Sequence, residues 1–224
     1  MQLNRFKQAS IDSLKWSTTP AFNKKQIFYY LAKGLGLIFL IAFISLLSQF
    51  DGLYSAKGIV PIAQTLEKLN NQQISWFRLP HFFFLSSVIP IKTLIGCGIV
   101  CSVLLMLGIV PFVSTLICWA LYLSMVNLGS PFMSFQWDIL LLEISFLWMW
   151  AMPLTWFWRS SDHYAPNRWI VYASYWCCFR LMFGSGLVKI VSNDTHWTHL
   201  TALDYHYYTQ PIPHYLSWFF HQLP

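Results

Sequence analysis

A long, mostly apolar run from residue 91 to residue 127 constrains the fold of this chain more than any other feature of its sequence. Its nearly 37 residues would extend about 55 Å as one α-helix, whereas the hydrocarbon core of a bilayer measures roughly 30 Å. The sequence Gly-Ile-Val-Pro at residues 108–111 lies near the middle of the run and is typical of a turn. We therefore predict two membrane-spanning helices, at about 92–109 and 112–127, joined by a tight turn, rather than one bent helix.

Composition extends this interpretation to the rest of the chain. Charged residues make up 10% of the sequence, against about 25% in a typical soluble domain. We expect further spans at about 26–48, 136–156 and 168–191. Residues 61–70 are expected to form a short surface helix, and residues 76–84 an aromatic stretch at the membrane interface. The predicted fold is an all-α integral membrane protein: a bundle of about five transmembrane helices with interfacial helices and an aromatic, histidine-rich outer segment.

The distribution of cations predicts the orientation of this bundle. Six of the fourteen Lys and Arg residues lie within the first 33 positions, ahead of or just inside the first apolar segment. The positive-inside rule then places the N-terminus in the cytosol and gives the net charge of +6 a topological meaning, so we reject a nucleic-acid interface. We divide the chain into a basic cytosolic segment (1–25), the transmembrane bundle (26–191) and a non-cytosolic capping segment (192–224).

Ionisable side chains inside the predicted spans are the strongest chemical signal. Counted from the outer ends of their spans, Glu143 lies roughly 10 Å deep and Arg180 about 16 Å deep. A charge at the centre of an isolated membrane helix costs roughly 2.5–3.5 kcal/mol or more, so both should face the bundle interior and pair with each other. Asp138 and Lys189 lie nearer the outer surface and form a second predicted pair. Together with Gln136 these four residues form the predicted polar core.

The two predicted pairs do not share one helical face. At 3.6 residues per turn, Arg180 and Lys189 point about 180° apart, and Asp138 and Glu143 about 140° apart. Two interpretations therefore stay open. The charges are either ion pairs that specify how the helices pack, or the lining of a polar pocket that opens to the outer face.

The capping segment contains most of the remaining polar chemistry. Five of the seven histidines lie between Asp194 and His221. His196 and His199 stand three residues apart with carboxylates nearby, but this spacing matches no closed metal motif such as H-E-x-x-H. We therefore predict no metal and no cofactor, and expect histidines that hydrogen-bond at the interface. The expected outer cap consists of Asp194, Trp197, Asp204, His206 and Tyr207.

Three stretches of the sequence resemble the lipase maturation factor family. The second of them is SFQWDILLLE at residues 134–143. The third and most specific begins with FRLMFGSGLVK at residues 179–189 and ends with HQLP at residues 221–224. The first stretch comprises LIFLIAFISL at 37–46, Gly52-Leu53 and KGIVP at 57–61. Between its two ends, the third stretch also contains Trp197, LTAL at 200–203, YHY at 205–207, TQP at 209–211, Pro213 and Trp218.

The resemblance covers about residues 30–224 and corresponds to the N-terminal membrane half of that family. It implies a multi-span membrane protein that assists the folding and assembly of secreted dimeric lipases. It implies residence in the endoplasmic reticulum membrane if the source is an animal, and we expect the inner membrane if the source is bacterial. It also implies that the family's client-binding C-terminal domain is not contained in this chain.

From the residues and the resemblance we predict an assembly factor for secreted lipases or other secreted proteins, and not an enzyme. Its expected partners are membrane lipid and secreted lipase clients. The alternative is a membrane-embedded enzyme with an outward-facing pocket, in which Lys189 or His206 acts as a general base. A cavity that reaches both residues would favour the enzyme, whereas a packed interior with paired charges would favour the assembly factor.

Overall fold

The computed structural model describes residues 24–72, 79–80, 90–129, 131–162, 164–209 and 214–223. These residues form α-helices and connecting segments and contain no β-strand, which confirms the predicted all-α class. The chain divides into two compact units, Met1–Val171 and Tyr172–Pro224, and each is described on its own. The predicted basic segment at 1–25, apart from its last two residues, and the aromatic stretch at 76–84, apart from Leu79 and Pro80, lie outside the described residues.

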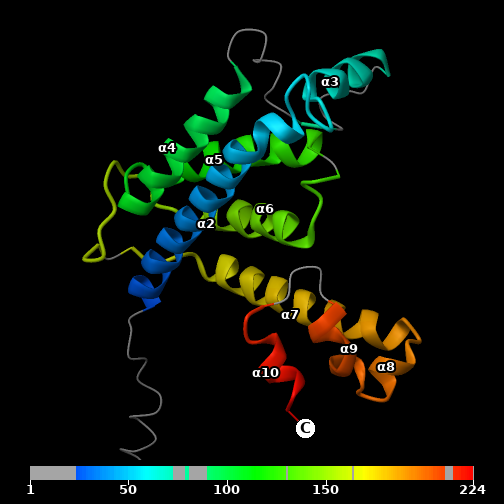
Figure 1. Cartoon of the computed structure of the whole chain (residues 1–224). Coiled ribbons are helices and arrows are strands. Elements are labelled where there is room, and N and C mark those ends of the chain that lie inside the picture. The colour runs from blue at the N-terminus through cyan, green and yellow to red at the C-terminus, as the bar shows by residue number, and fades with distance from the viewer. Residues whose placement is uncertain are drawn as a thin grey trace, which may run out of the picture. The chain divides into compact units, whose positions relative to one another are not determined.

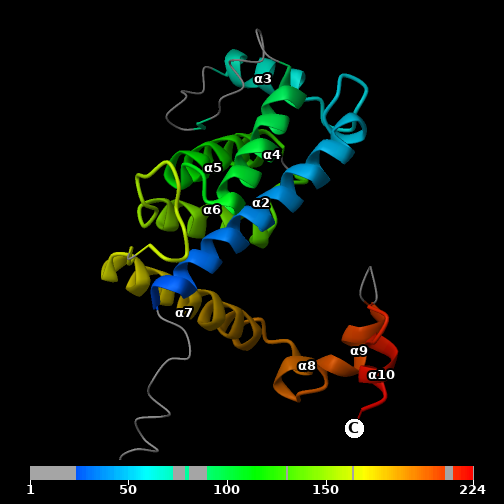
Figure 2. The same cartoon turned by 90° about the vertical axis from the view of Figure 1, so that its left-hand side faces the viewer.

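In the described part of the first unit, four long helices and one short helix precede the start of α7 (Arg168–Val191). The helix α2 packs along α4, and α5 lies between α4 and α6 (Figures 1 and 2). The short α3 follows α2 and contacts α5. The bounds are α2 Lys24–Leu53, α3 Ile62–Asn71, α4 Ile91–Leu107, α5 Pro111–Leu128 and α6 Gln136–Met149.

The two faces of α2 indicate whether water or lipid surrounds the first unit. Phe39 and Phe43 are fully buried on the face that packs into the unit. The opposite face is also apolar, and it leaves Ile38, Ile41 and Ile44 exposed. A helix with apolar side chains on both faces is typical of a membrane span, since lipid rather than water covers the outer face.

The lengths of the described helices support only some of the five predicted spans. Among the described residues, two helices are long and apolar enough to cross a membrane, Gln26–Leu53 and Pro111–Leu128. The apolar helix α4 has 17 residues, slightly fewer than the roughly 20 that a perpendicular span needs. The count of five spans therefore stays a prediction.

Two helices end at positions that differ from the predicted span ends. The helix α2 continues beyond residue 48 to Leu53, and the side chains of Ser48 and Gln49 bond back to Ser45 within it. The helix α6 ends at Met149, although the predicted span runs to residue 156. Pro153 explains the earlier end, since proline offers no N–H and disfavours a helical residue before it.

The turn between α4 and α5 lies where the Gly-Ile-Val-Pro sequence predicts it. Gly108 adopts the left-handed φ of 76°, and Pro111 opens α5. The backbone N–H of Val110 donates to the carbonyl of Trp156 at 2.9 Å, and the N–H of Trp158 donates to the carbonyl of Gly108 at 2.8 Å. A Cβ on Gly108 would lie 2.4 Å from the Trp158 carbonyl oxygen. Only glycine therefore fits this clamped turn.

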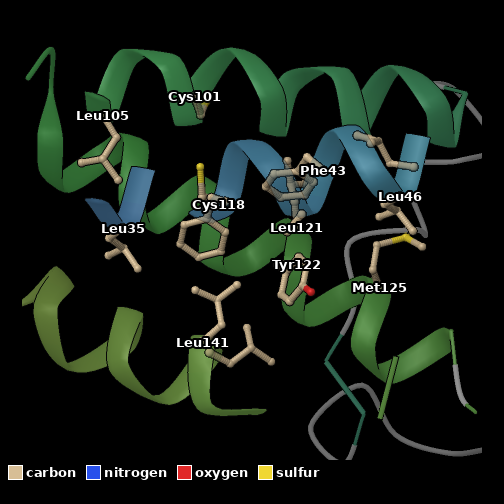
Figure 3. Packing of buried hydrophobic residues seen from close by; sticks show 14 of the residues in the cluster. Leu35, Phe43, Leu46, Cys101, Leu105, Cys118, Leu121, Tyr122, Met125 and Leu141 are labelled. Atoms are coloured by element: carbon tan, nitrogen blue, oxygen red, sulfur yellow. The ribbon is translucent and has the colours of Figure 1, made fainter. Parts of the chain in front are cut away.

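Figure 3 shows buried side chains of the first unit, where the rings of Phe43 and Tyr122 lie among aliphatic and sulfur-containing residues. The rings of Phe39, Phe43 and Tyr122 lie 5.7 to 6.1 Å apart, so α2 and α5 interlock through them. Gly98 of α4 faces the Phe43 ring so closely that a Cβ there would lie 2.7 Å from it. The small residue permits the close approach of α4 to α2.

The second unit contains most of α7 (Arg168–Val191), followed by three short helices that Figure 2 traces in order. These are α8 (Thr195–Thr198), α9 (Ala202–Thr209) and α10 (Ser217–His221). The helices α9 and α10 pack on each other, with the Tyr207 and Phe220 rings stacked at 6.0 Å. The helix α7 has the bounds predicted for the fifth span, while its crossing of the membrane stays a prediction.

Candidate functional site

The buried polar centre of the first unit is built around Asp138, the third residue of α6. Its Oδ1 accepts a hydrogen bond from the Tyr122 hydroxyl at 2.5 Å, and its Oδ2 accepts one from the backbone N–H of Phe135 at 3.3 Å. A carboxylate in the first turn offsets the unpaired N–H groups and the positive end of the helix dipole. Asp138 thus stabilises the start of α6 and ties it to α5.

Tyr54 brings the end of α2 close to this polar centre. The side chain is buried, and its hydroxyl donates to the carbonyl of Gly129 at 3.0 Å, directly after α5. Burial, and next the negative charge of Asp138, raise the pKa of Tyr54 to about 12. The site therefore favours a neutral phenol at this position.

The sequence prediction did not include Tyr122 or Tyr54. A signal was present in the sequence for Tyr122, which stands within the apolar stretch of α5. A tyrosine hydroxyl buried in such a helix usually has a hydrogen-bond partner, so this residue is a signal for a polar group on a neighbouring helix. The neighbouring carboxylate is Asp138.

The other members of the predicted polar core occupy different environments. Gln136 is exposed at the first position of α6, and Glu143 is half-buried further along the same helix. The predicted partners of Asp138 and Glu143, which are Lys189 and Arg180, belong to the second unit. The pairs Asp138–Lys189 and Glu143–Arg180 stay predictions.

Lys189 and Trp197 are in contact within the second unit. The Lys189 ammonium nitrogen lies 4.4 Å from the centre of the Trp197 ring, the geometry of a cation–π interaction. Lys189 stands in the last turn of α7, where a cation also complements the unpaired carbonyls of the helix end. The contact joins α7 to α8. The sequence prediction assigned Lys189 to the polar core and Trp197 to the outer cap.

Asp194 and His196 organise the short helix α8. The Asp194 carboxylate accepts a hydrogen bond from the His196 backbone N–H at 2.9 Å and so caps the helix. The His196 ring lies 4.6 Å from the Tyr205 ring of α9, and its Nδ1 lies 3.3 Å from the Thr201 hydroxyl. These contacts give His196 a structural role between α8 and α9.

The remaining cap residues lie on α9. Asp204 and His206 are exposed, and the His206 ring lies 5.6 Å from the ring of Tyr207. Tyr207 in turn stacks on Phe220 of α10. Tyr207 therefore helps to hold the second unit together, whereas Asp204 and His206 are presented on its surface.

A cavity of about 160 Å³ lies in the first unit, beside the turn between α4 and α5. Its lining includes neither Lys189 nor His206, the two predicted base candidates. Within the part of the chain that the structure describes, no group of three or more His, Cys, Asp or Glu side chains is placed to hold a metal ion. The cavity is lined by Val110, Phe112, Val113, Pro153, Leu154, Thr155 and Trp156.

Comparison with known proteins identifies relatives over nearly the whole chain. Lipase maturation factor 2 of Gallus gallus is 39% identical over an alignment of 210 positions that covers 85% of this chain and 28% of that protein. Lipase maturation factor 2 of Homo sapiens is 35% identical, over 86% of this chain and 30% of its own length. Lipase maturation factor 1 of Bos taurus is 31% identical, over 87% of this chain and 36% of its own length.

This chain thus spans about a third of the length of the curated relatives it matches. No solved structure matches it. None of these relatives supports the membrane-enzyme alternative, since each is named a maturation factor. The family model of the lipase maturation factor transmembrane domain matches residues 27–224. The chain is therefore a membrane protein that belongs to the lipase maturation factor family.

Proposed function

We propose that this chain is the membrane part of a maturation factor that assists the folding or assembly of secreted lipases or other secreted proteins. The observation that carries the proposal is the match of the family's transmembrane domain to residues 27–224. The names of the relatives attach lipase maturation to those longer proteins, and we extend that activity to this chain. The membrane lipid and the secreted lipase are its proposed partners.

The contacts of the polar residues support an assembly factor rather than an enzyme. Asp138 is fully buried and shares its two oxygens between Tyr122 and the start of α6. Lys189 lies over the face of Trp197. The first contact joins α5 to α6 and the second joins α7 to α8, as expected of a protein whose charged residues stabilise helix packing.

We further propose five spans, with the N-terminus in the cytosol and the capping segment on the outer side, in the endoplasmic reticulum or a bacterial inner membrane. The cation distribution supports this topology. Single cysteines in a cysteine-free background test it: Tyr215→Cys in the capping segment should react with a membrane-impermeant maleimide added from the outer side. Ser161→Cys, between α6 and α7, should react only after the membrane is opened. Reversed labelling would reject the topology.

The maturation activity is tested in cells that lack their own lipase maturation factor. The chain is expressed with a secreted lipase, and lipase activity in the medium is scored separately from the amount of chain in the membrane. Lipase maturation factor 1 of Homo sapiens serves as the positive control. If the chain reaches the membrane at a normal level and lipase activity stays at the empty-vector level, the proposed function is wrong for this chain.

Two variants then separate the scaffold from the enzyme. Arg180→Met and Lys189→Ala should lower the amount of chain and the lipase activity in proportion, while Lys57→Ala removes an exposed cation as the matched control. A Lys189→Ala variant with a normal protein level and no activity would contradict a purely structural role.

A further inference from the structure

We propose that the first unit binds one anionic phospholipid at the end where α4 meets α5. An acyl chain of the lipid fills the cavity there, and its phosphate lies beside the cations of the same end. The proposal rests on the placement of this unit in a membrane and is independent of any lipase client. Its supports are the size of the cavity, its fixed walls, its exposed rim and the charge around it.

The size and lining of the cavity fit a slender apolar ligand. Its volume of about 160 Å³ is well below the roughly 300–1,000 Å³ of sites for drug-sized molecules. All of the lining side chains except Thr155 are apolar. A segment of one acyl chain matches both the volume and the chemistry.

The walls of the cavity are held in place by the backbone. Val110 and Trp156, which both line the cavity, are joined by a hydrogen bond of 2.9 Å between the Val110 N–H and the Trp156 carbonyl. The ring of Phe112, another lining residue, lies 6.2 Å from the ring of Trp150. Segments from α5 and from the connection after α6 thus form one preorganised surface, which lowers the entropic cost of binding.

The rim of the cavity is unusually apolar for an exposed surface. Leu154 is 82% exposed and Trp156 is 77% exposed, although both line the cavity. Phe157 and Trp150 add two further exposed aromatic side chains. Tryptophan is enriched at the headgroup level of membranes, so this rim places the cavity mouth where an acyl chain meets its headgroup.

The charge at this end favours an anionic headgroup. The Lys33 ammonium donates to the carbonyl of Met106 at the end of α4 and lies over the Tyr29 ring, which in turn packs on Trp158. Arg159 follows Trp158 directly. At the start of α4, by contrast, Lys92 is paired with Asp51 at 2.7 Å. The carboxylate of Asp162 accepts a hydrogen bond from the Arg159 backbone N–H at 2.7 Å.

Native mass spectrometry of the purified chain in a mild detergent tests the proposal. Phosphatidylglycerol and phosphatidylcholine with the same acyl chains are titrated in competition. The expected result is a single retained lipid with a preference for phosphatidylglycerol. Val113→Trp should fill the cavity and abolish retention, whereas Val100→Trp on exposed α4 surface, outside the cavity lining, should leave it unchanged. Arg159→Gln should keep the bound lipid but reduce the preference about fivefold, and Lys57→Gln should not.

The Val113 variant tests the acyl-chain site, and the Arg159 variant tests the headgroup. Retention by Val113→Trp at the level of Val100→Trp overturns the acyl-chain site, and equal preferences of Arg159→Gln and Lys57→Gln overturn the headgroup assignment. If Val113→Trp does not yield a monodisperse protein, Thr155→Tyr blocks the same cavity and gives the same decision. If a variant loses the lipid but lipase secretion stays normal, the proposed function is unaffected. If the lipid is retained but lipase secretion is lost, the lipid site is unaffected.

Discussion

The Tyr122 hydroxyl on α5 donates a hydrogen bond of 2.5 Å to the Asp138 carboxylate on α6, and both side chains are shielded from solvent, at 1% and 0% exposure. The same carboxylate accepts the N–H of Phe135 at the start of α6. One buried acid therefore stabilises a helix terminus and a contact between two helices.

Replacing Tyr122 by Phe should destabilise the first unit by about 1–3 kcal/mol, because the fully buried Asp138 loses one of its two donors. Asp138→Asn should also be destabilising, since its amide oxygen can still accept from Tyr122 but its NH2 group cannot accept from the Phe135 N–H. Thermal unfolding in detergent measures both variants. Tyr30→Phe makes the same chemical change at an exposed position and should have no measurable effect. Equal melting temperatures for Tyr122→Phe and Tyr30→Phe would mean that the bond contributes nothing.

Gly108→Ala should destabilise the protein by more than about 1 kcal/mol, because the residue has φ of 76° and its new Cβ would meet the Trp158 carbonyl oxygen at 2.4 Å. Gly34→Ala is the matched control. Gly34 lies within α2, and a Cβ added there would meet no neighbouring atom within 4 Å, so alanine should be neutral or stabilising by up to about 1 kcal/mol. Chemical denaturation should show a loss of stability for Gly108→Ala and no loss for Gly34→Ala, and similar losses for both variants would refute the clamped turn.

Tyr54→Phe should change how stability depends on alkaline pH. The pKa of Tyr54 is about 12 in the folded protein and about 10 when unfolded, so below pH 10 the phenol is neutral in both states. Between pH 10 and 12 only the unfolded state loses the proton, and stability falls by up to about 1.4 kcal/mol per pH unit. The variant should be less stable by about 0.5–1.5 kcal/mol at neutral pH, through loss of the bond to Gly129. It should become the more stable protein between pH 10 and 12, because the loss of stability that the wild type suffers across that window is larger than this deficit. Parallel pH profiles for the two proteins would contradict this assignment.

Lys189 and Trp197 should show a coupling free energy of about 0.5–1 kcal/mol in a double-mutant cycle built from Lys189→Met and Trp197→Leu. Hydrogen exchange of the amides in α8 reports the stability of that contact. Lys189→Arg should retain most of the coupling, because the guanidinium also stacks on an indole face. Purely additive effects of the two substitutions would show that the contact does not stabilise the second unit.

The turn at Gly108 and the polar pair at Asp138 show where prediction from the sequence stopped. The apolar run and its Gly-Ile-Val-Pro sequence were enough to predict two helices and a turn, since helix length and turn chemistry are local properties. The hydrogen bonds from this turn to Trp156 and Trp158 involve residues more than forty positions away. Similarly, the depth of Asp138 predicts a charged partner on another span, whereas its partner in the structure is a neutral hydroxyl on α5.

The sequence by itself determined the all-α class, the bounds of α7 and the membership of a membrane family. These follow from apolar periodicity, from composition and from motifs that are contiguous in the chain. Only the tertiary structure decided which side chains meet: Tyr122 with Asp138, Tyr54 with Gly129, and Lys189 with Trp197. The physical reason is that a buried polar group is satisfied by whichever donor the packing of apolar helices brings within about 3 Å, and that packing depends on side-chain shapes distributed along the whole chain.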